Sequence, residues 1–309
     1  MRIGYRSGCV GIVGRPNVGK STLLNYYVGE KVAIVSPRPQ TTRHRILGIC
    51  TRQDAQIIFL DTPGLHEPQH VLGRYLQEVV KAVVLEADLL LAVIDARSGI
   101  VEEDQRIFDR LKHALQPLGA GKTQRPCLLA INKVDLVKKP LLLPLLEACA
   151  KTALFADCVP VSALTGDQMD VLLDCLISKL PAGPRWYEPT QRTDQTSRQL
   201  VSELIREQVL LATRQEVPQA VAVLVDEMDD RQVIFVIRAT IVVDRSGQKA
   251  IVIGHGGAML KRIGQAARLH IERLLKRRVY LQLWVKVAEG WRNDPQMLRA
   301  LGYITGQRE

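Results

Sequence analysis

The sequence from residue 14 to residue 21 reads Gly14-Arg15-Pro16-Asn17-Val18-Gly19-Lys20-Ser21. It fits the phosphate-loop pattern of a glycine, four further residues and Gly-Lys-Ser. An apolar segment of buried-strand character, 9–13, precedes the motif, and a helical segment, 20–28, follows it and ends at Gly29, an expected C-terminal cap. A strand, a glycine-rich loop and a helix in this order point backbone N–H groups at phosphate oxygens. We therefore predict a phosphate-binding loop here.

Two side chains of this loop are suited to nucleotide chemistry. The Lys20 ammonium is placed to contact the β- and γ-phosphates, and the Ser21 hydroxyl to bind Mg²⁺. A glycine-rich turn with a chance lysine is the alternative, and the fixed residues with their flanking elements disfavour it. We predict Lys20 and Ser21 to be catalytic and Ser21 to be a metal ligand, with Thr22 completing the nucleotide-binding stretch that begins at Gly14.

Length and composition indicate a two-domain globular protein. The 309 residues are long for one domain, and 47% hydrophobic with 24% charged content is ordinary for such a protein. No apolar run approaches the roughly 18 residues needed to cross a bilayer, and the first strand begins too early for a signal or transit peptide. Six cysteines without C-x-x-C pairing indicate reduced thiols and a cytoplasmic protein. The six histidines show no metal-site spacing.

Apolar segments suited to buried parallel strands alternate with helical segments through the first 180 residues. The expected strands are 9–13, 56–60, 89–95, 127–132 and 157–161, with 44–51 as an additional, more exposed strand. The expected helices are 20–28, 71–86, 103–118, 140–155 and 167–180. This order predicts an α/β fold, a doubly wound P-loop domain over residues 1–180, whose ligands lie beyond the carboxyl ends of the strands.

Two further segments are placed to meet the phosphates. Asp61-Thr62-Pro63-Gly64 follows an expected strand, so Asp61 is placed to hold Mg²⁺ through water and the Gly64 N–H to meet the γ-phosphate. Between this motif and the phosphate loop, residues 36–43 read as a mobile polar loop that can bring a threonine hydroxyl onto Mg²⁺. We predict Thr42 for that role, with Thr41 the alternative, and count Thr42, Asp61 and Gly64 among the catalytic residues.

The segment Asn132-Lys133-Val134-Asp135 indicates the base. A carboxylate such as Asp135 accepts two hydrogen bonds from the N1–H and the 2-amino group of guanine, and adenine offers no such pair. We expect Asn132 to tie this loop to the phosphate loop and the Lys133 stem to cover the ring. Ser162-Ala163-Leu164 follows the last strand and places the Ala163 N–H near guanine O6, although serine and alanine are common after strands. Together the motifs predict GTP and GDP as ligands.

At this point the sequence resembles a known family. The phosphate loop, the segment Gln40-Thr41-Thr42-Arg43-His44-Arg45 and the segment Asp61-Thr62-Pro63-Gly64-Leu65-His66 are similar to those of bacterial GTPases of the Era family. The resemblance implies hydrolysis of GTP to GDP and phosphate with Mg²⁺, coupled to assembly of the small (30S) ribosomal subunit. It also implies 16S ribosomal RNA, near its 3′ end, as the RNA ligand.

Two positions bear on the mechanism. Leu65 stands where Ras-like enzymes carry the glutamine that orients the attacking water, and an aliphatic side chain cannot do this. We therefore expect slow unaided hydrolysis, with water positioned by backbone, a bound ion or a partner. Asn17 resembles the asparagine with which related GTPases hold K⁺ beside the phosphates. A loop-stabilising role for Asn17 is the alternative.

Residues 181–192 are rich in proline and break both helix and strand, so we place a linker there and a second domain at 193–309. Its expected elements are a helix over 197–213 with apolar positions Leu200, Leu204, Val209 and Leu211, strands 220–225 and 233–243 with Asp229-Asp230 in the turn, two helices around 254–257, and a final strand 279–287. The stretch 249–286 holds 9 basic residues and 1 acidic residue. Such a concentration of charge favours a polyanionic partner.

Gly254-His255-Gly256-Gly257 lies between the two expected helices. G-x-x-G alone is common in turns, but the basic field and the order helix-strand-strand-helix-helix-strand resemble a type II KH domain, a small α+β fold that clamps about four single-stranded nucleotides. His255 stands where the family usually has lysine. The predicted RNA-binding residues are Gly254, His255, Gly256, Gly257, Lys261, Arg262 and Arg268. We expect the tryptophans to pack rather than to stack on bases.

Three other functions remain open from the sequence alone. A tRNA-modification GTPase would carry a reactive cysteine near its C-terminus, and no cysteine follows Cys175. A passive RNA-binding module would use the nucleotide only structurally, so Lys20→Ala would leave its role intact. A membrane-surface protein would use the basic patch on acidic lipid. We expect a cytoplasmic monomer, with peripheral association at the inner face of the cell membrane as a further possibility.

Overall fold

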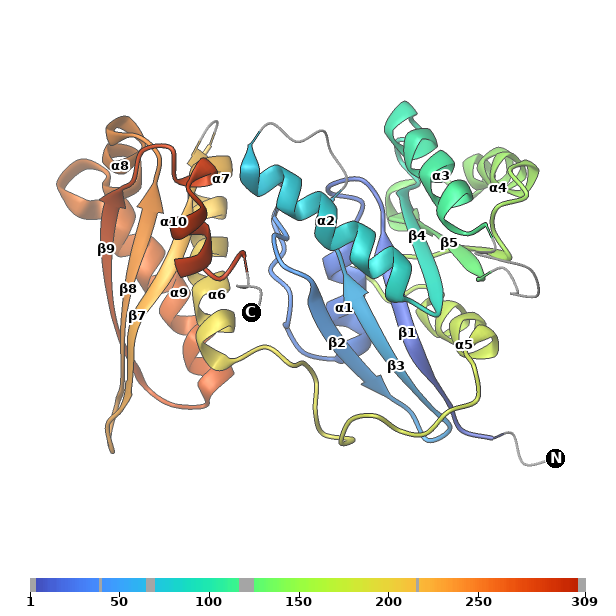
Figure 1. The fold of residues 1–309 in the computed structure, drawn as a ribbon, viewed down its shortest axis with the longest axis horizontal. Coiled ribbons are helices and arrows are strands. Elements are labelled where there is room, and N and C mark those ends of the chain that lie inside the picture. Colours follow the sequence, from blue (N-terminus) through green and yellow to red (C-terminus); the bar gives the residue numbers. More distant parts are fainter. Residues whose placement is uncertain (1–3, 39–40, 65–69, 117–124, 215–216, 305–309) are drawn as a thin grey trace. The chain divides into compact units, whose positions relative to one another are not determined.

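The computed structural model describes residues 4–38, 41–64, 70–116, 125–214 and 217–304. Figure 1 shows its helices and strands. The chain forms two compact units, and their bounds cross in the sequence. The first unit consists of Met1–Ala33, Thr42–Glu67 and Leu76–Asp194. The second consists of Gln195–Glu309 together with two segments from the N-terminal half, Ile34–Thr41 and Pro68–Tyr75.

The first unit is built on a six-stranded sheet with the order β2-β3-β1-β4-β5-β6, as the alternating pattern predicts. All neighbouring strands are parallel except β2, which runs antiparallel to β3. The strands are β1 (Arg6–Val13), β2 (Ile46–Thr51), β3 (Ala55–Asp61), β4 (Leu89–Asp95), β5 (Cys127–Asn132) and β6 (Asp157–Pro160). The helices that accompany them are α1 (Lys20–Val28), α2 (Val71–Glu86), α3 (Glu102–Ala114), α4 (Leu142–Lys151) and α5 (Met169–Lys179).

Helices cover both faces of this sheet. Apolar residues of α1 and α5 share one core with alternate residues of the central strands, while α3 and α4 share another core with the remaining residues. Gly29 ends α1 in the left-handed conformation, and its N–H donates to the Asn25 carbonyl, so the predicted cap is confirmed. The helix expected over 103–118 ends at Ala114, and residues 117–118 lie outside the described part of the chain.

The prediction that β2 is exposed was wrong, because the expected linker covers its edge. The Ile49 N–H donates to the Arg192 carbonyl (2.8 Å), and the Thr193 hydroxyl donates to the Leu47 carbonyl (2.6 Å). Five of the six residues of β2 are buried: Ile46 and Cys50 lie in the core with α1, and Leu47 and Ile49 lie in a smaller cluster against which Tyr187 of the linker packs. The linker also pairs with β1 at its start, where the Ser7 N–H donates to the Pro181 carbonyl. Residues 181–194 therefore belong to the first unit.

The second unit is built on a three-stranded sheet with the order β7-β8-β9, in which β7 and β8 are antiparallel and β8 and β9 are parallel. Helices α6, α8 and α9 pack their apolar residues on this sheet in one core. The order of these elements is the helix-strand-strand-helix-helix-strand order that the sequence predicts. Their bounds are α6 (Ser197–Ala212), β7 (Ala222–Asp230), β8 (Phe235–Val243), α8 (Ser246–Ile253), α9 (Ala258–Leu275) and β9 (Val279–Val287), with short helices α7 (Val217–Ala220) and α10 (Pro295–Ala300).

Three details of the second unit differ from the expectation. Leu211 is half exposed, whereas the predicted Leu204 and Val209 are buried together with Val201, Ile205 and Leu210. Asp229 and Asp230 pair with β8 as the last residues of β7, so they do not form the turn. Trp291 is fully buried and its Nε1–H donates to the Ala220 carbonyl (2.9 Å), but Trp186 and Trp284 are about half exposed. The packing role is confirmed for Trp291 and stays a prediction for Trp186 and Trp284.

Candidate nucleotide and RNA sites

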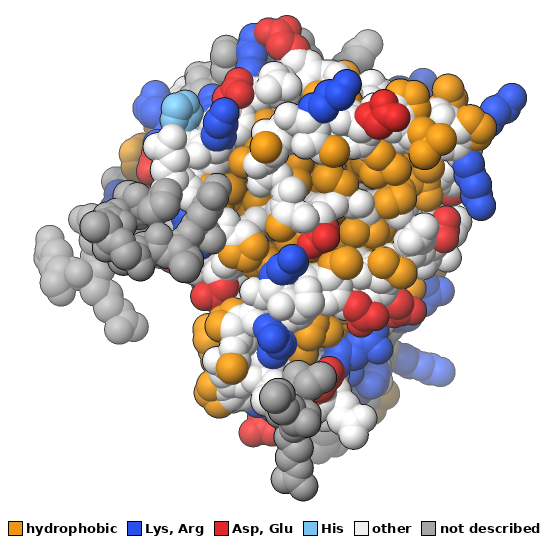
Figure 2. All heavy atoms as spheres, turned by 90° about the vertical axis from the view of Figure 1, so that its right-hand side faces the viewer, with side chains coloured by type: hydrophobic (Ala, Val, Ile, Leu, Met, Phe, Trp, Pro, Cys, Tyr) orange, Lys and Arg blue, Asp and Glu red, His pale blue; other side chains and the backbone are white. Residues whose placement is uncertain are grey.

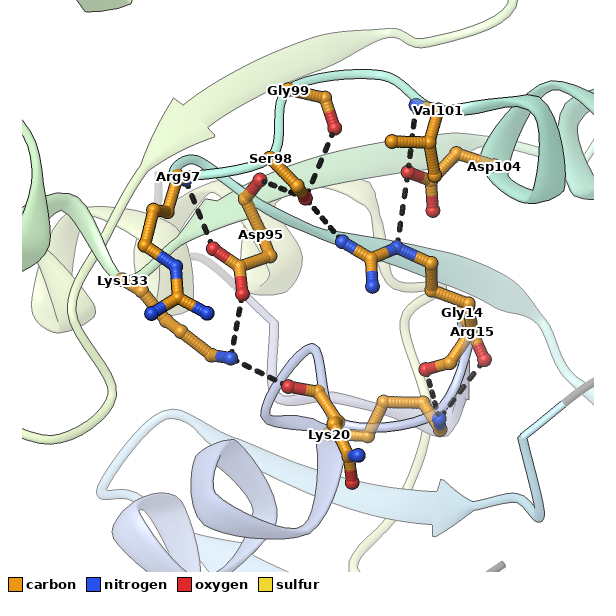
Figure 3. A network of polar contacts seen from close by, with 11 residues as sticks. Gly14, Arg15, Lys20, Asp95, Arg97, Ser98, Gly99, Val101, Asp104 and Lys133 are labelled. Atoms are coloured by element: carbon orange, nitrogen blue, oxygen red, sulfur yellow. Dashed lines mark hydrogen bonds and ion pairs between the residues drawn. The ribbon is translucent and has the colours of Figure 1, made fainter. Parts of the chain in front are cut away.

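The phosphate loop joins the end of β1 to the start of α1. Gly19 caps the helix with φ 103°, and a Cβ there would lie 2.2 Å from the Asn132 amide nitrogen, so only glycine fits. The Lys20 ammonium is buried and donates to the carbonyls of Gly14 (2.9 Å) and Arg15 (3.0 Å), as Figure 3 shows. Burial lowers the pKa of Lys20 from 10.5 to about 8. The Lys20 ammonium is thus held at two carbonyls of the loop, and a bound anion would stabilise its charged form.

Three oxygen-bearing side chains predicted as metal ligands come together beside this loop. The Ser21 hydroxyl donates to Asp61 Oδ2 (2.6 Å), and Thr42 Oγ1 lies 3.0 Å from Ser21 Oγ and 3.4 Å from Asp61 Oδ2. Asp61 Oδ1 is buried and has no hydrogen-bond partner in the described part of the chain. Burial raises the pKa of the Asp61 carboxyl. Two hydroxyls and a carboxylate, one of whose oxygens is buried and unpartnered, fit a hard cation such as Mg²⁺.

The structure separates the two candidate threonines. The Thr41 hydroxyl donates to the Arg38 carbonyl (2.7 Å) and is not among the three clustered oxygens, whereas Thr42 is. The segment after β3 is fixed at its start by Thr62, whose hydroxyl donates to the Ile12 carbonyl (2.8 Å). Gly64 lies against the phosphate loop, since a Cβ there would come within 2.7 Å of the Pro16 ring. Leu65 lies outside the described residues.

The base-recognition segments meet at the ends of β5 and β6. The Asn132 amide donates to the Val18 carbonyl (2.8 Å) and accepts from the Ala163 N–H (3.0 Å), so it joins the phosphate loop to the last motif. The Ser162 hydroxyl donates to Asp135 Oδ1 (2.6 Å) and orients that carboxylate. The Ala163 N–H is thus engaged by Asn132, and its predicted contact with guanine O6 stays a prediction. Leu164 is exposed beside it.

Sequence reasoning missed a set of polar residues between β4 and α3 that supports the phosphate loop (Figure 3). Asp95, at the end of β4, accepts from the Lys133 ammonium (2.7 Å), which also donates to the Asn17 carbonyl (2.6 Å). Burial alone would raise the pKa of Asp95, but its hydrogen bonds from Lys133 and from the Arg97 N–H lower it. Asp95 is the last residue of a buried strand, as Asp61 is, and an aspartate at that place is the signal that could have identified it.

Arg15 is the predicted nucleotide-binding residue whose side chain points elsewhere. Its guanidinium donates to Asp104 Oδ2 (3.3 Å) and to the Ser98 hydroxyl, and Figure 3 shows it directed at the segment between β4 and α3. Asp104 is fully buried and also accepts from the Val101 N–H at the start of α3 (3.2 Å). Arg15 therefore fastens the phosphate loop to α3, and Ser98 and Asp104 had no signal in the sequence.

The predicted RNA-binding glycines lie between α8 and α9. Gly254, Gly256 and Gly257 all have positive φ (73°, 56° and 80°), and His255 between them is exposed. A groove of about 440 Å³ begins at Gly257 and runs between α9 and β9. Of the predicted basic residues, Lys261 and Arg268 line this groove, whereas Arg262 is not among the lining residues. The remaining lining residues, which the sequence did not single out, are Leu260, Gly264, Gln265, Tyr280, Leu281 and Leu283.

Comparison with known proteins identifies the family. A family model described as a 50S ribosome-binding GTPase matches residues 9–133, and a KH domain model matches residues 216–292. The GTPase Era of Staphylococcus haemolyticus is 44% identical over 306 residues, which is 98% of this chain and 99% of that protein. The chain belongs to the Era family of GTPases. Era of Staphylococcus epidermidis is likewise 44% identical over 306 residues, again 98% of this chain and 99% of that protein. The family resemblance seen in the sequence is confirmed, and so are the P-loop GTPase domain and the KH domain.

Two solved Era structures resemble the whole chain. One is Era in complex with MgGDPNP and nucleotides 1506–1542 of 16S ribosomal RNA, with 40% identity, a TM-score of 0.92 and coverage of 97% of this chain and 100% of that one. The other is a point variant of Aquifex aeolicus Era bound to GDP·AlF₄⁻, with 40% identity, a TM-score of 0.91 and the same coverage. The chain is thus a GTPase with a C-terminal KH domain.

Proposed function

We propose that this Era-family GTPase is a switch that binds 16S ribosomal RNA near its 3′ end and acts in assembly of the 30S subunit. The observation that carries the proposal is that one chain holds both parts of such a switch. The ligand set Ser21, Thr42 and Asp61 gathers beside the phosphate loop, and a grooved KH unit follows. The related Era that was solved with MgGDPNP and a 16S RNA segment supports both ligands.

In this proposal the described side chains divide the work on GTP. Lys20 and the backbone N–H groups of the phosphate loop bind the β- and γ-phosphates, and Asp135 with its Ser162 partner selects guanine. Ser21 and Thr42 would hold Mg²⁺ directly and Asp61 through water, and the bound ion would neutralise charge that develops on the phosphates. Hydrolysis then yields GDP and phosphate, and the Gly64 N–H contacts the γ-phosphate only while it is present.

The proposal includes a K⁺ ion that Asn17 helps to hold beside the phosphates. This residue has φ 64° and is exposed, and its carbonyl accepts from Lys133, so the backbone of the loop is fixed at this point. We expect K⁺ at this position to speed hydrolysis. The test compares turnover in KCl and NaCl at equal ionic strength, for the wild type and for Asn17→Ala. Equal turnover of the wild type in both salts would refute the role.

The main test measures GTP hydrolysis with and without an RNA of nucleotides 1506–1542 of 16S ribosomal RNA, and with 30S subunits. We expect slow turnover alone and a change when the RNA binds, and we expect Lys20→Ala to abolish turnover. Turnover that ignores the RNA would contradict the switch. A Lys20→Ala variant that still supports 30S maturation in cells would instead favour the passive RNA-binding module. Equal stimulation by transfer RNA would favour the tRNA-modification class.

A second observation favours peripheral contact with an acidic membrane. Leu141, just before α4, and Leu143, in its first turn, are 65% and 64% exposed, next to the exposed Lys138 and Lys139. Figure 2 shows hydrophobic side chains gathered on the face that carries α4. Exposed leucines beside lysines suit the boundary of an acidic lipid surface. Within the described residues no helix is long and apolar enough to span a membrane.

Flotation with vesicles tests this contact. We expect binding to phosphatidylglycerol vesicles that is lost in Leu141→Ser with Leu143→Ser, whereas Leu211→Ser, an exposed leucine of α6, should bind like the wild type. Equal flotation of all three proteins would refute the role of α4. The monomeric state stays a prediction, which sedimentation can check.

A further inference from the structure

Helix α6 of the second unit carries an unusual run of buried polar residues. Arg206 and Glu207 are 1% and 2% exposed, and Gln208 is buried as well. A charge buried in this way costs several kcal/mol unless it is paired and hydrogen-bonded. Arg206 is paired one turn earlier on the same helix, where Glu203 accepts from its Nε (2.9 Å) and its Nη2 (2.6 Å). The forked pair fixes the guanidinium in one orientation.

The fixed guanidinium and its neighbour hold backbone from the N-terminal half of the chain. Arg206 Nη2 donates to the Thr41 carbonyl, and Glu207 Oε1 accepts from the Val35 N–H (2.9 Å). Arg38 Nη2 in turn donates to the Thr213 carbonyl just beyond α6 (3.1 Å). The apolar side chain of Ile34 lies in the hydrophobic core of the second unit. Four described residues between 34 and 41 are therefore anchored to the second unit, in agreement with the division of the chain.

The residue that follows Thr41 is Thr42, whose hydroxyl lies 3.0 Å from Ser21 Oγ in the first unit. Arg206 thus holds the carbonyl of the peptide bond whose nitrogen belongs to Thr42. A hydroxyl that must meet a metal ion within a few tenths of an ångström depends on where its backbone is fixed. The position of the Thr41 carbonyl therefore bears directly on where the Thr42 hydroxyl can lie.

We propose that Arg206, oriented by Glu203, is a positioning residue of the GTPase site, and that it favours the triphosphate state by holding the Thr41 carbonyl. This inference rests on the proposed function, because it assigns Thr42 to Mg²⁺. Thr42 has its role only when a γ-phosphate and Mg²⁺ are both bound, so the contact raises affinity for GTP and not for GDP. Such coupling is reciprocal. A ligand that disturbs α6 therefore changes the affinity for GTP by the same factor by which GTP changes the affinity for that ligand.

The test uses two variants of the full chain. In Arg206→Lys the ammonium can still pair with Glu203, but it has no planar fork with which to reach Thr41 as well. In the double variant Glu203→Met with Arg206→Met the buried pair is replaced by apolar side chains of similar size, which avoids an unpaired buried charge. We expect the ratio of GDPNP affinity to GDP affinity, both with Mg²⁺, to fall about tenfold in the double variant and less in Arg206→Lys.

The control is Arg238→Lys. Arg238 lies on β8 of the same unit and pairs with Glu227, and none of its described bonds involves residues 34–41. We expect its nucleotide affinity ratio to equal that of the wild type. If Arg206 had a purely structural role, its substitution would weaken the binding of both nucleotides equally or would lower only the melting temperature. Calorimetry measures both quantities.

The outcomes separate this inference from the proposed function. If the wild type hydrolyses GTP and its affinity for nucleotides 1506–1542 of 16S ribosomal RNA differs between GDPNP and GDP, the proposed function stands. If the double variant then folds and keeps the wild-type GDPNP-to-GDP ratio, the role of Arg206 is refuted while the proposed function survives. We expect the variant also to lose the difference in RNA affinity between the two nucleotide states. A wild type without GTP hydrolysis or RNA binding would refute the proposed function itself.

Discussion

Replacing Asn132 by alanine tests whether this one side chain joins the separate segments of the nucleotide site. Its amide is 2% exposed and makes two hydrogen bonds, to the Val18 carbonyl in the phosphate loop (2.8 Å) and from the Ala163 N–H after β6 (3.0 Å). The substitution leaves both backbone groups without this partner. A buried polar group without a hydrogen bond costs about 1–3 kcal/mol. Water that enters the vacated space recovers part of this cost.

We therefore expect nucleotide binding to weaken by about 2 kcal/mol, which is roughly a 30-fold rise in Kd. The assay is titration calorimetry with GDP, which avoids hydrolysis during the measurement. Thermal unfolding of the nucleotide-free protein is recorded alongside, because the same bonds stabilise the fold. A less stable fold alone lowers the apparent GDP affinity only by the fraction of unfolded protein, and the measured loss of affinity should exceed that amount.

The matched control is Gln56→Ala. Gln56 is also a fully buried amide of the first unit, and its bonds go to the Thr51 hydroxyl and to the backbone of Trp186 and Tyr187, away from the phosphate loop. It makes more hydrogen bonds than Asn132, so we expect a larger fall in melting temperature with unchanged GDP affinity. Asn132→Ala binding GDP like the wild type, or both variants losing affinity equally, would refute the reasoning.

Three further predictions concern single groups. Asp135→Asn should weaken GDP binding roughly 10- to 100-fold and improve binding of xanthosine diphosphate, whose ring offers a carbonyl where guanine has the amino group; unchanged preference in competition assays would contradict it. Because burial lowers the pKa of Lys20 to about 8 and bound phosphate favours its charged form, GDP binding should take up protons and weaken as the pH rises through about 8; calorimetry in buffers of different ionisation enthalpy would show no uptake if this is wrong. His255→Lys adds a fixed charge beside Gly254 and Gly256, so RNA affinity should rise and its salt slope steepen by about 0.7; an unchanged slope in binding titrations would place His255 away from phosphate.

The parts of the site that the sequence predicted are those fixed by local rules. Position 19 must be glycine because its φ is positive and the Asn132 amide lies close to it. The motif already has a glycine at this fixed place, so the sequence was enough to predict it. Strands β4 and β5 have the predicted bounds because their buried apolar runs end where polar residues begin. The burial of β2 was missed because the strand is covered by residues 192–193, and such a pairing across the sequence leaves no periodic signal.

Residues that act through contacts with distant parts of the sequence could not be predicted either. Asp104 looks like an ordinary acidic residue in the first turn of a helix, where it favours the helix dipole. Only the fold shows that it is fully buried and bound to Arg15 of the phosphate loop. Arg206 and Glu203 likewise resemble an exposed ion pair of a helix surface. Spacing within a helix identifies the pair, but not whether it is buried or what else it binds.

The chain passes from the second unit to the first between Thr41 and Thr42, and this crossing explains what Arg206 and Glu203 can do. A boundary placed by proline content separates residues 1–180 from the rest, but residues 34–41 pack with the second unit while Thr42 belongs to the first. The covalent bond between Thr41 and Thr42 therefore joins the hydrogen-bond network of α6 to the proposed metal ligands. A switch needs an element whose position two ligands both bias. In the proposed switch this peptide bond is such an element, because Arg206 holds its carbonyl oxygen and Thr42, which supplies its nitrogen, carries the hydroxyl that a triphosphate would use.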